Sequence, residues 1–213
     1  MNDKLIYYQN LAAKTVKEIY SGSDYWMTFL NTASKMYKYP FADQILIHVQ
    51  MPEATACAEY RIWNDTMHRY VKKGSRGIAL LTETDYGIGL RYVYDVSCTG
   101  TRKSSRNVDA FVYRDVHDPA VFSVLGEGNS LEEKLFFCAK CLLSENYVEN
   151  ISQSRDLLDK SDEFRYNRST EETMLNFAAA SAAYMAIHRM GQTSEICRQL
   201  LMTADYAALS DPI

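Results

Sequence analysis

The stretch "RYVKKGSRGIALL", residues 69–81, places four basic side chains and two glycines directly before a run of small and branched apolar residues. Branched apolar residues favour strands, and glycines permit turns and close approach of the backbone. We therefore expect residues 72–77 to connect a strand that begins at Val71 with another that begins at Ile78. The stretch predicts a hairpin with a basic turn, within a short antiparallel sheet over residues 69–96.

The residues before this stretch have the periodicity of helices. Residues 3–20 predict a first helix, residues 21–24 ("SGSD") break the chain, and a second helix carries residues 26–37. Pro40 forces a new start, so residues 41–51 form a third helix. The positions expected to face inward are Leu5, Tyr8, Leu11, Ala12, Val16 and Ile19; Trp26, Phe29, Leu30, Ala33, Met36 and Tyr37; and Phe41, Ile45, Leu46 and Val49.

Irregular chain and short strands are expected after the sheet. Residues 99–107 ("TGTRKSSRN") carry no hydrophobic anchor and predict a mobile loop. Residues 110–116 and 120–125 are either two further short strands or extended segments that cover a sheet edge.

The C-terminal part is helical in composition. Ser130 with Glu133, and Ser169 with Glu172, have the spacing of capping boxes, each before an apolar run. Gly191 closes the second of these helices, and a last helix is expected over residues 194–207.

These segments predict an α+β fold in which N-terminal helices pack on a small antiparallel sheet, followed by a helical C-terminal part. We expect one domain over residues 1–128 and a helical extension over residues 129–213.

Composition limits the classes of function. The chain has 213 residues, of which 47% are hydrophobic, enough to form a core. No apolar run reaches the roughly 18 residues of a membrane span, and the N-terminus does not resemble a secretory leader. We therefore expect a cytoplasmic protein with no membrane partner. Its five cysteines, an odd number, favour reduced thiols.

Charge is distributed unevenly along the chain. The net charge is -4, but residues 61–106 hold nine Lys or Arg against four acids, a balance of +5. In the same segment, tyrosines alternate with these cations, a combination that suits single-stranded nucleic acid because bases stack on rings while cations neutralise phosphates. The alternative is that the rings are core or cross-strand residues and the cations only solvate an exposed face.

The sequence shows no catalytic pattern. Its four histidines lack metal-ligand spacing, and neither a phosphate-binding loop nor a nucleophile elbow occurs. Cys138 and Cys141 have a spacing that can hold zinc, but they lie in an apolar helical pattern that favours core packing. We expect no catalytic residue, metal or cofactor. A metal held by Cys57, His48 or His68 is the alternative.

The order of residues in one long segment is informative. Residues 39–81 contain an ordered set of residues: Tyr39, Pro40, Gln50, Pro52, Ala54, Thr55, Trp63, Arg69, Val71, Lys73, Gly74 and Gly77. In this order they resemble the N-terminal domain of ArdC-type antirestriction proteins. Residues 91–100 look like the strand that follows in versions carried by large mobile-element proteins of Gram-positive bacteria. Asp43 departs from the family pattern, in which asparagine is frequent. The protease motif H-E-x-x-H found in many members is absent.

The resemblance implies non-catalytic binding of single-stranded DNA, with a role in protecting or handling DNA transferred by plasmids and conjugative elements. Cations are expected to neutralise phosphates, Tyr70 and Tyr60 or Tyr92 to stack on bases, and Trp63 to anchor the core. The nucleic-acid-binding residues predicted in this way are Arg61, Arg69, Tyr70, Lys72, Lys73, Gly74, Arg76, Gly77, Arg91 and Tyr92.

The alternative function is a protein-interaction module that inhibits a host restriction or defence protein. In that case acids in residues 130–134 and 156–164 would imitate the charges of DNA.

Overall fold

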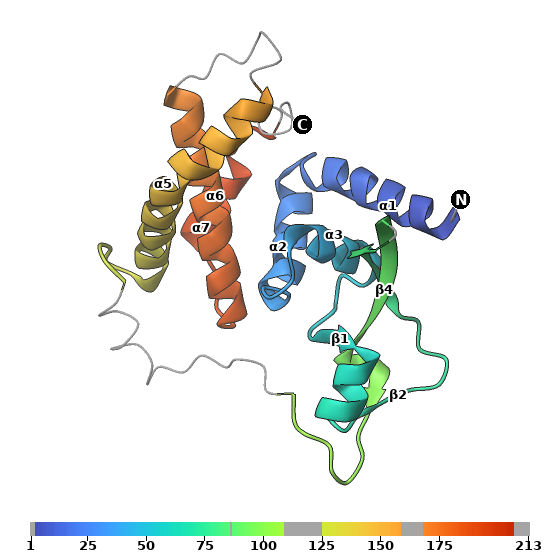
Figure 1. Cartoon of the computed structure of the whole chain (residues 1–213). Coiled ribbons are helices and arrows are strands. Elements are labelled where there is room, and N and C mark those ends of the chain that lie inside the picture. The colour runs from blue at the N-terminus through green and yellow to red at the C-terminus, as the bar shows by residue number, and fades with distance from the viewer. Residues whose placement is uncertain (1–2, 86, 109–124, 159–167, 207–213) are drawn as a thin grey trace. The chain divides into compact units, whose positions relative to one another are not determined.

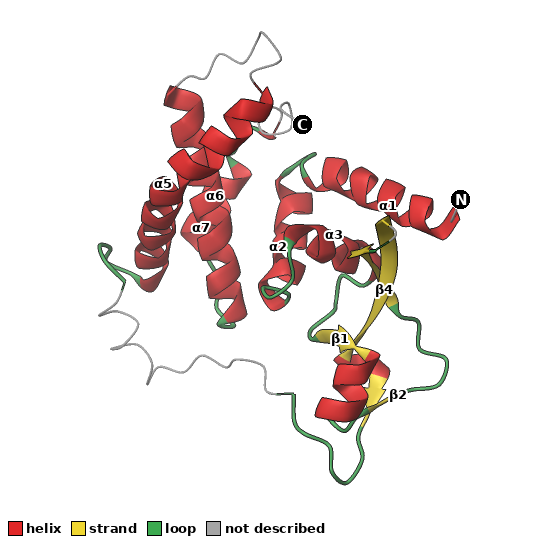
Figure 2. Ribbon diagram, viewed as in Figure 1, coloured by secondary structure: helices red, strands yellow, loops and turns green. Residues whose placement is uncertain are grey.

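The computed structural model describes residues 3–85, 87–108, 125–158 and 168–206. They form two compact units, within residues 1–111 (unit 1) and within residues 112–212 (unit 2). The predicted α+β class is confirmed, because N-terminal helices and small antiparallel sheets are followed by a helical part (Figures 1 and 2). The domain boundary predicted at residue 128 stays a prediction.

Three helices open unit 1: α1 (Asp3–Ile19), α2 (Ser23–Lys35) and α3 (Phe41–Gln50). Pro40 precedes α3 in an extended conformation, as its missing N–H and fixed φ favour.

The expected burial is wrong for Tyr37 and Phe41, which are exposed. It is only partial for Val49 and, in α1, for Leu5, Leu11, Ala12 and Val16. Asp43 and Ile47 are buried instead. The reason is that α3 contacts α1, α2 and a strand, so its buried arc is wider than one apolar stripe.

The strands form two separate sheets. One has the order β1 (Cys57–Glu59), β4 (Gly87–Asp95) and β3 (Ile78–Thr84), and the other pairs β2 (Tyr70–Val71) with β5 (Thr99–Gly100). All pairs are antiparallel, as predicted.

The predicted hairpin between Val71 and Ile78 is wrong, because their strands lie in different sheets. The N–H of Lys72 donates to the carbonyl of Cys98 over 2.9 Å, which continues the pairing of β2 toward β5. Strand β3 pairs along its whole length with β4.

The core of unit 1 packs α1 and α3 against the β3–β4 ladder. Its buried residues are Tyr8, Met36, Leu46, Ile47, Ala54, Ile78, Ala79, Leu80 and Val93. Gln50 at the end of α3 covers the free edge of β3, since its side-chain amide donates to the carbonyl of Ala79 over 2.9 Å and accepts from the N–H of Ala79 over 3.0 Å. The edge strand is therefore partly satisfied by a side chain, which limits its exposure to other chains.

Trp63 anchors the chain between the two sheets. It lies in η1 (Ile62–Thr66), a short π-helical turn, is only 2% exposed, and donates from Nε1 to the carbonyl of Tyr94 over 2.7 Å. The interpretation of Trp63 as a core residue, not a platform for a base, is confirmed.

Asp95 joins the end of β4 to two other segments. Its carboxylate accepts hydrogen bonds from the backbone N–H groups of Thr55, Ala56 and Ser97, at 2.7, 2.9 and 2.9 Å. Burial by itself would raise the pKa of this carboxyl, but the donated hydrogen bonds outweigh burial and lower the pKa below its ordinary value.

The segment after β4 is more ordered than the sequence predicts. After η2 (Val96–Cys98), Thr99 and Gly100 form β5, and the following loop is tied to η1 and its flank. The Arg106 N–H donates to the carbonyl of Met67 over 2.9 Å, and the Ser105 hydroxyl donates to the carbonyl of His68 over 2.7 Å. The prediction of a loop is wrong for Thr99 and Gly100, which form β5, whereas residues 101–107 form a loop that polar contacts tie to η1 and its flank.

Unit 2 contains α5 (Leu131–Leu158), α6 (Arg168–Arg189) and α7 (Glu195–Met202). The first capping box is confirmed in its Ser130 half, since the Glu133 N–H donates to the Ser130 hydroxyl over 3.1 Å. The Glu133 carboxylate accepts from the N–H of Asn129 over 2.7 Å, one residue before the expected N–H of Ser130. Gly191 closes α6 with φ of 75°, and the N–H of Gln192 reaches back to the carbonyl of Ile187.

Two helix ends in unit 2 differ from the prediction. Ser169 lies inside α6, which already includes Arg168. Helix α7 ends at Met202, and the hydroxyl of the next residue, Thr203, lies within hydrogen-bond distance of the carbonyls of Gln199 and Leu200. The strands predicted over residues 110–116 and 120–125 lie outside the described residues, apart from position 125.

Candidate nucleic-acid interface

The connection between β2 and β3, residues 72–77, runs along the side of unit 1 from one sheet to the other (Figure 1). It begins with a tight turn in which the Ser75 N–H donates to the carbonyl of Lys72 over 3.1 Å. Gly74 occupies the third position of this turn with φ of 85°, a conformation that glycine adopts without strain. The prediction that a glycine of this connection takes positive φ is confirmed for Gly74.

The cations of this connection face solvent. Lys72, Lys73 and Arg76 are exposed, and none of them forms an ion pair with a described residue. Lys72 Nζ donates to the carbonyl of Ser97 over 2.9 Å, which fixes the direction of that side chain without neutralising its charge. These three charges are therefore available to an anionic ligand.

Arg76 and Gly77 border a groove formed with the start of α1 and with β4. Two cavities, with volumes of about 420 Å³ and 630 Å³, share four lining residues, so they form one continuous groove. We call it the tyrosine groove. The residues of its outer part are Asp3, Lys4, Tyr7, Tyr8, Arg76, Gly77, Tyr92 and Tyr94.

The rings of this groove differ in exposure. Tyr7 is 57% exposed and Tyr92 is 42% exposed, whereas Tyr8 is buried in the core. The rings of Tyr7 and Tyr8 meet edge to face, with their centroids 5.1 Å apart. Tyr8 therefore supports Tyr7, and the two exposed rings can offer faces to a planar ligand.

Gly77 lets an aromatic ring approach the backbone closely at the side of the groove. A Cβ atom at this position would lie 3.2 Å from Cζ of Tyr94, which is tighter than an ordinary contact. The Tyr94 ring therefore packs directly on the glycine backbone. The close approach predicted for a glycine of this connection is confirmed at Gly77.

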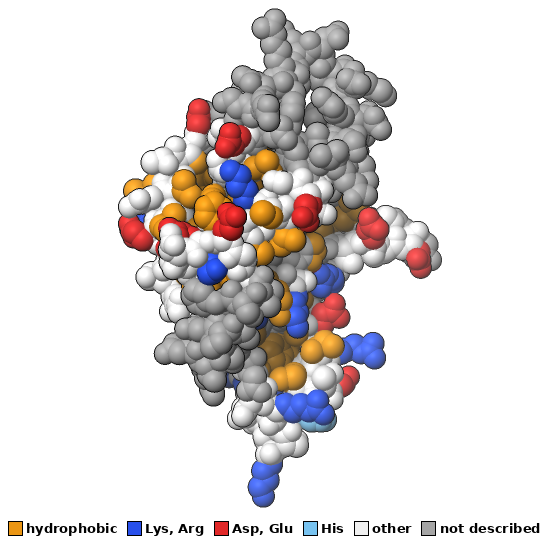
Figure 3. All heavy atoms as spheres, turned by 90° about the vertical axis from the view of Figure 1, so that its left-hand side faces the viewer, with side chains coloured by type: hydrophobic (Ala, Val, Ile, Leu, Met, Phe, Trp, Pro, Cys, Tyr) orange, Lys and Arg blue, Asp and Glu red, His pale blue; other side chains and the backbone are white. Residues whose placement is uncertain are grey.

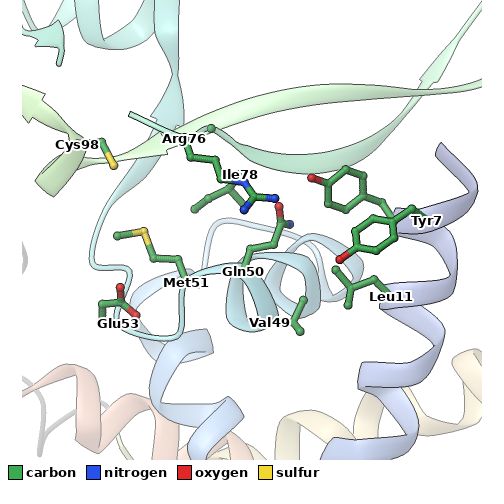
Figure 4. Close-up of a pocket in the computed structure, with 11 residues that line it drawn as sticks. Tyr7, Leu11, Val49, Gln50, Met51, Glu53, Arg76, Ile78 and Cys98 are labelled. Carbon is green, nitrogen blue, oxygen red and sulfur yellow. The ribbon is translucent and has the colours of Figure 1, made fainter. Parts of the chain in front are cut away.

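Figure 4 shows how side chains from different elements meet in the inner part of the groove. Arg76 projects toward Gln50 of α3, and Tyr7 of α1 closes the other side. Glu53 also lines this part, and Asp3 lines the outer part, so their charges balance those of Lys4 and Arg76. The groove is therefore aromatic and close to neutral, while the excess positive charge lies on the connection beside it.

Sequence reasoning missed the contribution of α1 to this site. Tyr7 was not assigned any role, and Tyr8 was expected only in the core. The available signal was a large aromatic residue outside the apolar stripe of an amphipathic helix, at a position that faces solvent. Sequence alone does not bring this helix beside residues that are about 70 to 85 positions away.

A second basic surface lies at the end of unit 1 formed by η1, β2 and the loop after β5. We call it the loop surface; its residues are Tyr70, Arg102, Lys103 and Arg106. The Arg102 guanidinium lies over the Tyr70 ring, 5.7 Å from its centroid, and the ring lies across Gly100. Lys and Arg side chains gather at this end of the molecule in Figure 3. Of these four residues, only Tyr70 had been predicted as a binding residue.

The other predicted residues have different environments. Arg69 is half-buried and donates from Nε to the Thr99 hydroxyl over 2.8 Å, so it braces β2 against β5. Arg61 is exposed immediately before η1, and Tyr60 beside it is 54% exposed. No contact described for Arg61 links it to the tyrosine groove.

Arg91 is already neutralised by neighbouring carboxylates. It forms an ion pair with the buried Asp43 of α3 and a longer one, at 3.5 Å, with Glu59 of β1. Burial raises the pKa of Asp43 even though the Arg91 guanidinium acts in the opposite direction. Arg91 thus holds α3 against the sheet, and we leave it out of the interface proposed below.

Asp43 has a structural role, which gives a physical reason for an aspartate at this position. Its carboxylate compensates Arg91, which also lies near the Tyr39 ring, 6.0 Å from the centroid. Burial raises the pKa of Tyr39 to about 12, and its hydroxyl donates to the carbonyl of Cys57 over 2.8 Å.

The thiols and imidazoles do not assemble into a metal centre in the part of the chain that the structure describes, where no group of three or more His, Cys, Asp or Glu side chains is placed to hold an ion. Burial raises the pKa of Cys57 to about 12, which keeps this thiol protonated and a poor ligand. Cys138 is half-buried but Cys141 is exposed, so the core-packing interpretation of this pair is wrong for Cys141.

None of the described helices is both long enough and apolar enough to cross a membrane.

In comparisons with known proteins, no family model, no curated protein and no solved structure matches this chain. The resemblance to the N-terminal domain of ArdC-type proteins therefore stays a prediction from the residues quoted above.

Proposed function

We propose that unit 1 binds single-stranded DNA without catalysing a reaction. The observation that carries this proposal is that Arg76 belongs both to the exposed basic connection and to the wall of the tyrosine groove. A single strand has the same two-sided character, with planar bases along one edge and phosphates along the other. Bases enter the groove, and the phosphates lie against Lys72, Lys73 and Arg76.

The chemistry of the groove suits bases, and the chemistry of the basic connection suits phosphates. Stacking of a base on an aromatic side chain contributes about 1 to 3 kcal/mol and tolerates every base, because each base has a π-face. Tyr7 and Tyr92 present such faces at the groove. The near-neutral lining of the groove suits bases better than phosphates. Lys72 and Lys73 beside the groove, together with Arg76 at its wall, suit the backbone of the strand.

The loop surface extends the same kind of contact. The Arg102 guanidinium lies over the Tyr70 ring in a cation–π contact, and Lys103 and Arg106 add exposed positive charge. In a duplex the bases are stacked on one another and are not free to enter a groove, so the rings favour a single strand. The role in handling transferred DNA of mobile elements is part of the proposal and rests on the family resemblance alone.

The alternative of an acidic surface that imitates DNA is less well supported. Glu132 is occupied inside unit 2, where it accepts from the Ser194 hydroxyl and from the N–H of Cys197. Glu133 accepts from the N–H of Asn129 in the capping box. These two carboxylates stabilise helix ends, so they are less available to a protein partner.

The test is a charge reversal of the basic connection. The variant Lys72→Glu/Lys73→Glu/Arg76→Glu is compared with wild type by fluorescence anisotropy, using labelled single-stranded and duplex oligonucleotides at several salt concentrations. Loss of three phosphate contacts lowers the slope of log K against log salt by about 2 for a single strand. We also expect wild type to prefer the single strand over the duplex.

A matched control separates the site from overall charge. Lys14, Lys17 and Lys35 are exposed cations of unit 1 that do not line the groove. The variant Lys14→Glu/Lys17→Glu/Lys35→Glu has the same change in charge and should keep most of the wild-type slope. If both triple variants lose the slope equally, or if neither does, the basic connection is not the site.

A further inference from the structure

A second pocket lies between the three N-terminal helices, outside the tyrosine groove. Its volume is about 560 Å³, and the polar side chains that line it are Thr15, Glu18, Asp24, Tyr25, Thr28 and His48. The C-terminal half of α1 contributes to this pocket, whereas the N-terminal half contributes to the groove. The nucleic-acid proposal makes no use of it.

Hydrogen bonds fix the tautomer of His48, which lines this pocket. The Thr32 hydroxyl donates its proton to the carbonyl of Pro52 over 2.8 Å. The same oxygen lies 2.9 Å from Nδ1 of His48, so Nδ1 carries the proton and donates to it. In the neutral ring, Nε2 is then an acceptor, and it has no hydrogen-bond partner among the described residues. Burial lowers the pKa of His48, which favours this neutral form.

The threonine hydroxyls of the lining are also restricted to accepting. Thr15 donates to the carbonyl of Leu11 over 2.8 Å, and Thr28 donates to the carbonyl of Asp24 over 2.7 Å. Each hydroxyl has one proton, so what remains for a ligand is its lone pairs. Among the described lining side chains, only the Tyr25 hydroxyl still has a proton to donate.

The charge of the pocket has one sign. Glu18 and Asp24 form no ion pair with any described residue, and the lining contains no Lys or Arg. Glu18 lies in the last turn of α1, where its negative charge adds to the negative end of the helix dipole. Lys17 in the same turn compensates the negative end of the helix but does not line the pocket, so a positive charge bound in the pocket would add to this compensation.

We propose that this pocket binds an organic cation with several N–H donors, namely a primary ammonium group on an alkyl chain. The cation donates to the carboxylates of Glu18 and Asp24 and to Nε2 of His48, and the Tyr25 ring contacts its alkyl part or its charge. Ile19 and Val49 supply the apolar part of the lining. A neutral or anionic ligand of equal size lacks the donors or the charge that this lining requires.

The experiment follows the NMR signals of the His48 ring and of the backbone amides of residues 15–28 in the full-length protein. The probes are butylammonium, its neutral counterpart 1-butanol, and the anion butyrate. We expect saturable shifts with butylammonium only. In the variant Glu18→Gln/Asp24→Asn, affinity for butylammonium should fall at least tenfold.

A control variant and a second variant keep the test decisive. Glu83→Gln/Asp85→Asn removes two exposed acids at the β3–β4 turn and should leave the affinity unchanged. If Glu18→Gln/Asp24→Asn does not fold, the single variant Glu18→Gln is measured instead. The side chain of Glu18 is exposed, so this substitution should leave the fold intact. Equal shifts with 1-butanol, an absence of saturation, or an equal loss in the control variant would overturn the proposal.

Two further probes identify the source of the ammonium group. Spermidine represents a free polyamine, and lysine methylamide represents a lysine side chain of a protein partner. Tighter binding of spermidine assigns the pocket to a polyamine, and tighter binding of lysine methylamide assigns it to a protein. Failure of both probes to compete with butylammonium would contradict an ammonium site.

Discussion

Asp95 provides the sharpest test of how unit 1 is held together. The variant Asp95→Ala removes the acceptor of three backbone N–H groups, those of Thr55, Ala56 and Ser97. A buried donor left without an acceptor costs about 1 to 3 kcal/mol. Thr55 and Ser97 are exposed residues, so water can partly replace the carboxylate at these two positions. We therefore assign the lower end of the range, about 1 kcal/mol, to each of the three donors, so the unfolding free energy falls by about 3 kcal/mol in total.

The variant Asp95→Asn separates the shape of the side chain from its accepting capacity. Its carbonyl oxygen can still accept from Thr55 and Ala56, but its amide group then meets the N–H of Ser97 as a second donor. We expect a loss of about 1 to 2 kcal/mol, smaller than for Asp95→Ala. Asp85→Asn, at the exposed β3–β4 turn, is the control and should change stability by less than about 0.5 kcal/mol.

Urea unfolding followed by tryptophan fluorescence measures these losses in the right part of the chain. Both tryptophans, Trp26 and Trp63, are buried in unit 1. With an m-value of about 1 to 3 kcal/mol/M, a loss of 3 kcal/mol shifts the midpoint by about 1 to 3 M. A shift for Asp95→Ala as small as that of Asp85→Asn would refute the reasoning.

The pH dependence supplies an independent check. The pKa of Asp95 is lowered in the folded state, so its carboxylate contributes stability that is present above the unfolded value of 3.8. This contribution is lost as the pH falls from 3.8 through the lower folded pKa. The difference in stability between wild type and Asp95→Asn should therefore shrink in that window. A difference that stays constant down to pH 2.5 would contradict the assignment.

Two further substitutions separate packing from binding. Arg91→Gln leaves Asp43 buried without its partner and should lower the unfolding free energy by about 2 kcal/mol; the salt slope of oligonucleotide binding, measured by anisotropy, should stay at the wild-type value. Gly100→Ala places a Cβ atom 2.3 Å from the Tyr70 ring, so this exposed ring must leave its present position, in which Arg102 lies over it. We expect a loss of less than about 1.5 kcal/mol in urea unfolding but several-fold weaker oligonucleotide binding, and an unchanged affinity would remove Tyr70 from the interface.

The parts of the fold that sequence could predict are those with a repeated local signal. The periodicity of residues 3–50 gave three helices at nearly the observed bounds, and the spacing of Ser130 and Glu133 gave a helix start. The β2–β5 ladder has two residues on each side, Tyr70–Val71 and Thr99–Gly100, which is too short for any periodic pattern. The pairing of β2 with β5 depends on contacts between residues far apart in the sequence, such as the one between Arg69 and Thr99.

The candidate site follows the same rule. Residues 72–77 could be predicted as a basic, glycine-containing connection because composition is local. The identity of its neighbours could not be predicted, since Tyr7 comes from a helix about 70 residues earlier. Arg91 was assigned to the interface by its charge alone, and only the fold reveals that Asp43 and Glu59 neutralise it.

The two halves of the proposed interface differ in how firmly they are held, and this difference has a consequence for recognition. Tyr92 and Tyr94 are carried by the central strand, and the carbonyl of Tyr94 is fixed by Trp63. Lys73 and Arg76 have no hydrogen bond or ion pair to a described residue. Rings on a fixed strand offer stacking faces at set positions to any base, whereas adaptable cations follow the phosphates of the strand. Stacking strength and salt dependence should therefore respond to different substitutions, those of Tyr92 and those of the basic connection.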